Sequence, residues 1–130
     1  MRTDAQTRGD DAESIAEQAL LRAGWIVLGR QVRIGRGELD LVAIDPGPPR
    51  MLVIVEVRWR RTRAFGLAEE TIDHRKRAHL RAAIGRLLED GLPGDVALPQ
   101  LPFRVDLVVV EPPSASGGER RMRHHRSIAL

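Results

Sequence analysis

The chain contains no cysteine and has few aromatic residues, which make up 3% of its 130 residues. The lack of cysteine excludes disulfide bonds, thiol catalysis and cysteine-based zinc sites, and it is typical of proteins in a reducing compartment. Valine, leucine, isoleucine and alanine must therefore form the core. The longest apolar runs, Met51–Val55 and Leu107–Val110, are far too short to span a bilayer. Because residues 1–13 also lack an apolar signal core, the sequence predicts a cytoplasmic protein without a membrane segment.

Lysine is nearly absent as well. Of the 21 basic residues, 20 are arginine and Lys76 is the only lysine. A GC-rich genome would explain this bias by itself, although the planar guanidinium group also suits phosphate, to which it donates two parallel hydrogen bonds. The formal net charge of +3 and the pI of about 10.8 permit nucleic-acid binding without requiring it.

The length suits one domain, which we place at residues 1–113, with residues 114–130 as a linker and a basic tail. Apolar periodicity and turn residues predict the elements in between. These are a helix from Asp10 to Gly24, a strand over 25–34 broken near Gly29, strands Glu38–Ile44 and Met51–Trp59, a helix from Thr71 or Asp73 to Gly91, and strand Phe103–Val110. This order predicts an α/β fold with a mixed central sheet flanked by helices.

Strand periodicity brings carboxylates together. If the two central strands form a hairpin centred on Pro48, residues whose numbers sum to 96 lie opposite each other. Asp40 then faces Glu56, and Glu38 faces Arg58. Opposed carboxylates repel by about 1 kcal/mol, and burial among leucine, valine and isoleucine adds to this cost.

A divalent cation between Asp40 and Glu56 would relieve that repulsion, and Mg²⁺ or Mn²⁺ suits such oxygen ligands. A metal ion there would polarise a phosphate and activate water. In the alternative interpretation, Arg58 simply forms an ion pair with Glu38 or Glu56, and Asp40 ends a strand.

Two charged residues lie on the apolar faces of the predicted helices. Glu13 precedes Ala16 and Leu20 at helical spacing, and Lys76 stands in the same way before Leu80 and Ile84. Both side chains are thus directed toward the domain. Alternatively, each belongs to a first helical turn and extends to water.

Basic residues follow the acidic ones closely in the sequence, in the runs 58–63 and 74–77. Phosphate binding needs cations beside a metal site, and a tryptophan among them could stack on an unpaired base. The candidate nucleic-acid-binding residues are Arg36, Trp59, Arg60, Arg61, Arg63, Arg75 and Arg77. In the alternative interpretation, which either run by itself favours slightly, these residues form a solvated surface. His124 and His125 could form a metal pair, but they also suit a disordered basic end.

Together these motifs resemble the YraN family of small bacterial proteins, within the restriction-endonuclease-like, or PD-(D/E)xK, superfamily. The similarity covers residues 12–110. The matching stretches are Ala12–Ala16 with Leu20, Gly24–Leu28, Gly37–Ala43, Val53–Arg58, Phe65–Gly66, Lys76 and Phe103–Asp106.

The resemblance implies a mixed sheet with flanking helices and metal-dependent hydrolysis of phosphodiester bonds. The motif order is also similar to that of archaeal Holliday-junction resolvases. Asp40 and Glu56 would bind Mg²⁺ or Mn²⁺, with Glu13 and Glu38 as accessory ligands. Arg58 occupies the place of the superfamily's lysine, and arginine stays protonated. Lys76 is therefore the candidate for the missing catalytic amine, beside Asp40, Glu56 and Arg58.

The leading hypothesis is a Mg²⁺- or Mn²⁺-dependent nuclease that acts on DNA in preference to RNA, on branched substrates or repair intermediates. One alternative is a binding module of the same fold that does not cleave, which the arginine at position 58 favours. Another is a protein-interaction adaptor whose carboxylates form ordinary ion pairs. The superfamily also implies a homodimer, although no stretch of the sequence identifies an interface.

Overall fold

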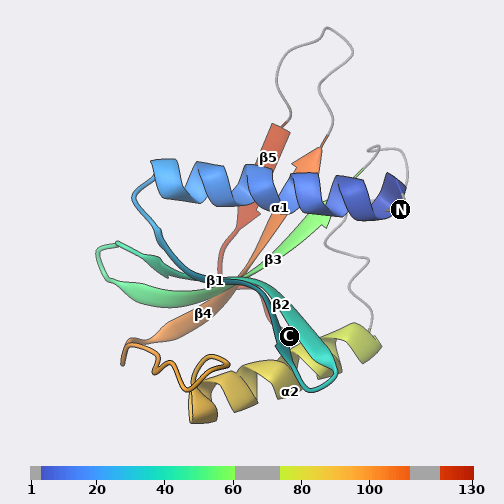
Figure 1. The fold of residues 1–130 in the computed structure, drawn as a ribbon. Coiled ribbons are helices and arrows are strands. Elements are labelled where there is room, and N and C mark those ends of the chain that lie inside the picture. The colour runs from blue at the N-terminus through green and yellow to red at the C-terminus, as the bar shows by residue number, and fades with distance from the viewer. Residues whose placement is uncertain (1–3, 61–73, 112–120) are drawn as a thin grey trace, which may run out of the picture.

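The structure, a computed structural model, describes residues 4–60, 74–111 and 121–130, and residues 4–10 by their backbone alone. A five-stranded mixed sheet lies between two helices (Figure 1), which confirms the predicted α/β class and is consistent with a restriction-endonuclease-like fold. The elements are α1 (Asp4–Arg22), β1 (Ile26–Ile34), β2 (Gly37–Asp45), β3 (Met51–Trp59), α2 (His74–Asp90), β4 (Phe103–Glu111) and β5 (Arg121–His125). Within the described ranges, no helix is both long and apolar enough to cross a membrane.

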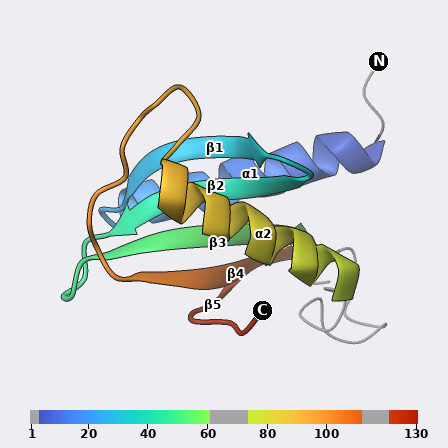
Figure 2. The same ribbon diagram turned by 90° about the horizontal axis from the view of Figure 1, so that it is seen from below.

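The strands lie in the order β1-β2-β3-β4-β5. All neighbours are antiparallel except β3 and β4, which are parallel and have α2 between them in the chain. The two helices cover opposite faces of the sheet, as the view from the α2 side also shows (Figure 2). Each face has its own apolar core, so β2 and β3 are buried on both sides as their continuous apolar sequences predict.

The apolar spacing on the two helices predicts which side chains are buried. Ala12, Ala16 and Leu20 of α1 recur every four residues and are all buried, and Gly24 ends this helix with a φ of 89°. On α2 the buried stripe is Leu80, Ala83, Ile84 and Leu87. The helix α1 begins at Asp4, earlier than the predicted Asp10, and the break near Gly29 is a bulge inside one continuous strand.

The predicted register between β2 and β3 is confirmed over five pairs, from Leu41↔Val55 to Asp45↔Met51, and each pair sums to 96. The ladder ends there, so the predicted backbone pairing of Asp40 with Glu56 is not formed. The backbone N–H of Val57 instead donates to Asp40 Oδ2 at 2.8 Å. The backbone ladder between β2 and β3 therefore ends at the two carboxylates.

The predicted basic tail contains a strand, whereas the predicted linker lies outside the described residues. Arg121–His125 is β5, which pairs antiparallel with β4. Ile128 and Leu130 then pack against the core on the α2 face. The sequence pattern did not predict this strand, because arginine and histidine occupy four of its five positions and leave no apolar alternation.

Candidate metal and phosphate site

Asp40 lies at an irregular point of β2. Leu39 and Val42 pack in the core on the α2 face, whereas Leu41 packs on the α1 face, so the regular alternation of the strand is broken beside Asp40. In β1, Gln31 has a φ of 47°, a conformation that is unusual for a residue other than glycine. Irregular strands often redirect side chains at functional sites, and here the Asp40 carboxylate accepts a hydrogen bond from β3.

Glu56 lies on β3, and its side chain is only 3% exposed. Its Oε1 atom is 2.8 Å from Lys76 Nζ and 3.7 Å from Arg58 Nη2. Its Oε2 atom is buried, and it has no hydrogen-bond partner among the residues that the structure describes. One carboxylate oxygen is thus held by cations, while the other keeps an unused capacity to accept.

The surroundings of Asp40 and Glu56 raise the pKa of both carboxyl groups, so that their ionisation is less favourable than usual. Burial raises the pKa of Asp40 to about 6, helped by the charge of Glu13 and opposed by the hydrogen bond from Val57. Burial also raises the pKa of Glu56 to about 7, helped by the charge of Asp40 and opposed by Lys76 and Arg58. A group that neutralises both carboxylates would relieve this repulsion.

The two predicted accessory acids have different surroundings. Glu13 of α1 is close enough to Asp40 to raise its pKa, and it accepts a hydrogen bond from Gln31 Nε2 at 3.1 Å. Glu38 does not face Arg58 as the extended register predicts. It lies opposite Arg33 of β1 and pairs with it at 3.6 Å, because the β2–β3 ladder ends before reaching it.

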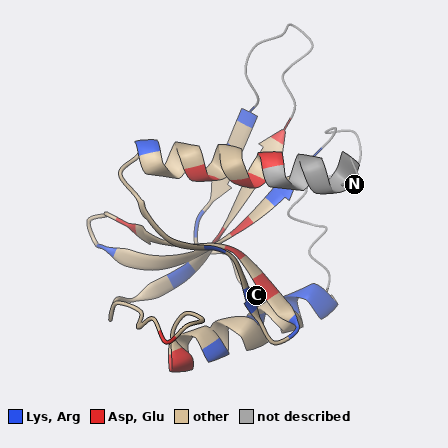
Figure 3. Cartoon of the chain, viewed as in Figure 1, with Lys and Arg blue, Asp and Glu red and all other residues tan. Residues whose placement is uncertain are grey.

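A hollow of about 470 Å³ opens between β2 and the first turns of α2. This α2-side hollow is lined by Arg36, Glu38, Asp40, Arg75, Lys76 and His79, and the basic first turns of α2 are visible in Figure 3. His79 was not predicted, although it follows Lys76 by three residues and so shares its helix face.

The other candidate nucleic-acid-binding residues lie elsewhere. Trp59 packs against the core on the α1 face, Arg60 is buried and Arg77 is half-buried. Arg61 and Arg63 lie outside the described residues. Of the seven predicted residues, the structure therefore places Arg36 and Arg75 beside the carboxylates.

The donor set suits a hard divalent cation. Asp40 and Glu56 offer carboxylate oxygens, and within the described ranges the buried Glu56 Oε2 accepts no hydrogen bond. Among the described residues, no group of three or more histidine, cysteine, aspartate or glutamate side chains could hold a metal ion. A two-carboxylate site completed by water and phosphate oxygens is nevertheless the arrangement in which Mg²⁺ is commonly bound.

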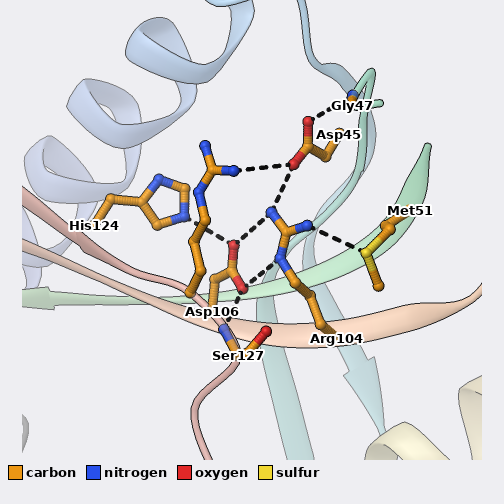
Figure 4. Close-up of polar contacts among 8 residues, drawn as sticks. Asp45, Gly47, Met51, Arg104, Asp106, His124 and Ser127 are labelled. Carbon is orange, nitrogen blue, oxygen red and sulfur yellow. Dashed lines mark hydrogen bonds and ion pairs between the residues drawn. The ribbon is translucent and has the colours of Figure 1, made fainter. Parts of the chain in front are cut away.

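A second polar cluster lies on the α1 face, around the wholly buried Asp106 (Figure 4). Asp106 accepts hydrogen bonds from Arg104 Nε at 2.9 Å and from Ser127 N at 3.0 Å, and His124 Nε2 lies 2.8 Å from its other oxygen. Arg104 also donates to Asp45 at 2.7 Å. This Asp106 cluster fastens β5 and the C-terminal residues to the sheet. The sequence showed no pattern that links these distant positions.

Comparisons with known proteins agree with the motifs. Residues 12–110 match the model of the "Uncharacterised protein family UPF0102". A UPF0102 protein of Roseiflexus castenholzii is 42% identical over 83% of this chain and 82% of its own length. Those of Pseudomonas paraeruginosa and Carboxydothermus hydrogenoformans are 39% and 36% identical, over 85% and 79% of this chain and 82% and 80% of their own lengths. The chain therefore belongs to the UPF0102 family, the YraN family that its motifs resemble.

Proposed function

We propose that this protein is a metal-dependent nuclease that hydrolyses phosphodiester bonds in DNA, including branched or repair intermediates. The observation that carries the proposal is the pair formed by half-buried Asp40 and buried Glu56, whose pKa values are raised to about 6 and about 7 where the β2–β3 ladder ends. Two carboxylates that repel each other in a poorly solvated place do not stabilise the fold. The simplest explanation for their presence is therefore a positively charged ligand that they bind.

Each side chain has a role in this proposal. Asp40 and Glu56 hold Mg²⁺ or Mn²⁺, with Glu13 and Glu38 as outer acids that orient water. When bound, the cation neutralises phosphate charge and lowers the pKa of the attacking water. Lys76, at 2.8 Å from Glu56, orients that water and takes part in its deprotonation. Arg58 remains protonated and donates to a phosphate oxygen.

The test is to incubate the protein with junction, flap, duplex and single-stranded DNA, with and without Mn²⁺. Wild-type cleavage that requires the metal and is lost in both Asp40→Ala and Glu56→Ala would support the proposal. Glu89→Gln, which changes an exposed acid at the far end of α2, serves as the matched control and is expected to cleave normally. Metal-independent product, or cleavage that survives both alanine substitutions, would refute it.

Lys76→Ala is expected to lower the cleavage rate by about 10²–10⁴-fold, the range for loss of a group that handles a proton. Lys76→Arg keeps the positive charge beside Glu56 but cannot release a proton at neutral pH. If Lys76 takes part in proton transfer, the arginine variant will therefore stay as slow as the alanine variant. Rate measurements at saturating DNA and Mn²⁺ distinguish the roles, since full rescue by arginine would show that the charge alone matters.

A second candidate function is a nucleic-acid-binding module without cleavage. It is favoured by one contact, because Lys76 and Arg58 together already approach Glu56 Oε1 and could neutralise Glu56 without a metal ion. In that case the DNA mixtures above would show salt-sensitive binding and no product in Mn²⁺.

A further inference from the structure

Asp40 stands between two hollows of similar size. The α2-side hollow holds Asp40 itself. The second, which we call the α1-side hollow, is also about 470 Å³ and lies between α1 and β1. It is lined by Glu13, Ser14, Glu17, Gln18, Arg30 and Gln31, and it reaches Leu41, the next residue after Asp40. A nucleic-acid strand bound at Asp40 has these two hollows into which it can extend.

The α1-side hollow is acidic. Glu13 and Glu17 both face it, and its arginine, Arg30, is paired with Glu17 at 2.6 Å between Nε and Oε2. That pair leaves the charge of Glu13 uncompensated by Arg30. The phosphates of a strand that extended into the α1-side hollow would be repelled by the negative charge of Glu13, because like charges repel at close range.

The α2-side hollow has the opposite character. Arg36 and Arg75 are exposed on its rim, and within the described parts of the chain neither forms an ion pair with a carboxylate. Its outer acid, Glu38, is paired with Arg33. The two rim arginines therefore keep their charge available for phosphate, and His79 adds a further donor beside them.

Close packing sets the position of the turn that carries Arg36 relative to the helix that carries Arg75. A Cβ atom at Gly37 would lie 2.8 Å from Ala83 Cβ and 2.9 Å from the carbonyl oxygen of His79. The turn that carries Arg36 thus rests directly on α2, which carries Arg75, because residue 37 has no side chain. The backbone positions of the rim are therefore set by packing between the turn and α2.

We infer that the protein grips a nucleic-acid strand on one side only of the phosphate held at Asp40 and Glu56. The flanking phosphates run across Arg36 and Arg75 in the α2-side hollow, and the α1-side hollow receives no strand. The substrate class is accordingly a strand that is bound on a single flank, such as a free single-stranded end. This inference rests on the proposed binding of nucleic acid, but its test does not depend on cleavage.

The absence of cysteine makes the test direct, since one introduced cysteine can be labelled uniquely. His74→Cys places a benzophenone label beside Arg75, Ser14→Cys places it in the α1-side hollow, and Glu89→Cys places it at the far end of α2 as the control. Each protein is irradiated with short oligothymidylate in Ca²⁺. The His74 label is expected to give at least about tenfold more cross-linked product than the Ser14 label, within the range of electrostatic focusing.

A second measurement tests whether Arg36 and Arg75 are the residues that bind the strand. The double variant Arg36→Gln, Arg75→Gln is expected to reduce the salt dependence of oligothymidylate binding, with the log–log slope falling by about 1.4, since each single-strand phosphate contact contributes about 0.7. Equal cross-linking from the two hollows, more from Ser14, or none above the Glu89 control would overturn the inference, as would an unchanged slope. If the His74 label cross-links more than the Ser14 label but the protein gives no Mn²⁺-dependent cleavage product, the proposed nuclease activity is refuted and the one-sided binding stands. If the protein cleaves DNA but the two labels cross-link equally, the one-sided binding is refuted and the nuclease activity stands.

Discussion

Glu56→Gln is expected to raise the free energy of unfolding at pH 8 by about 1–3 kcal/mol, since one pKa unit corresponds to about 1.4 kcal/mol. The pKa of Glu56 is raised from 4.5 to about 7 by burial and by Asp40. The folded state therefore binds a proton more tightly than the unfolded state, and stability falls as the pH rises from about 4.5 to about 7. Glutamine cannot ionise, so the stability of the variant does not fall in this way as the pH rises. We therefore expect the variant to be more stable than the wild type above pH 7 and about equally stable below pH 5.

The measurement is urea unfolding at pH 5 and pH 8, with Glu89→Gln as the exposed control that should show no such difference. Mn²⁺ should stabilise the wild type at pH 8 by binding the folded state, and it should stabilise Glu56→Gln much less. The same substitution is expected to lower metal-dependent cleavage by about 10²–10⁴-fold, equivalent to several kcal/mol of lost stabilisation of the transition state. A variant that is less stable than wild type at pH 8 would show instead that Glu56 is mainly the ion-pair partner of Lys76.

Asp106→Ala is expected to destabilise the protein by about 3–5 kcal/mol, the usual cost of removing one partner from a buried charge cluster. Asp106 is wholly buried, and its loss would leave His124 and the Ser127 N–H without their acceptor. Arg104 would keep its ion pair with Asp45 and its weaker contact with Met51 Sδ. Because His124 and Ser127 join β5 and the following residues to the sheet, these residues should lose protection against amide hydrogen exchange first.

Asp95→Asn is the control for Asp106→Ala, because Asp95 is exposed and asparagine tolerates its φ of 61°. The pH dependence gives a second check. Burial raises the pKa of Asp106, but hydrogen bonds from His124, Arg104 and Ser127 outweigh burial and lower it below 3.8. The wild type should therefore lose this stabilisation as the pH falls below about 4, whereas Asp106→Ala should not. A change of less than about 1 kcal/mol at pH 7 would mean that the Asp106 cluster is not needed to hold β5.

Local patterns in the sequence were enough to predict the elements that carry the site. Continuous apolar runs identify β2 and β3 as buried on both faces, and the short loop between them fixes their register, since antiparallel neighbours joined by a tight connection have few alternatives. The same reasoning placed Lys76 on the buried face of its helix. The irregularity at Asp40 was not predictable, because nothing in residues 38–42 signals that the ladder stops there.

The sequence by itself determined the α/β class, the faces of the strands outside the irregular part of β2, and the choice of Asp40 and Glu56 as the candidate pair, because side-chain periodicity depends only on neighbouring residues. Tertiary structure alone decided that Lys76 reaches Glu56, that the α2-side hollow is basic while the α1-side hollow is acidic, and that β5 joins the sheet. Each of these depends on how a helix or a distant strand crosses the sheet. The packing of the whole core sets that geometry, and no local spacing records it.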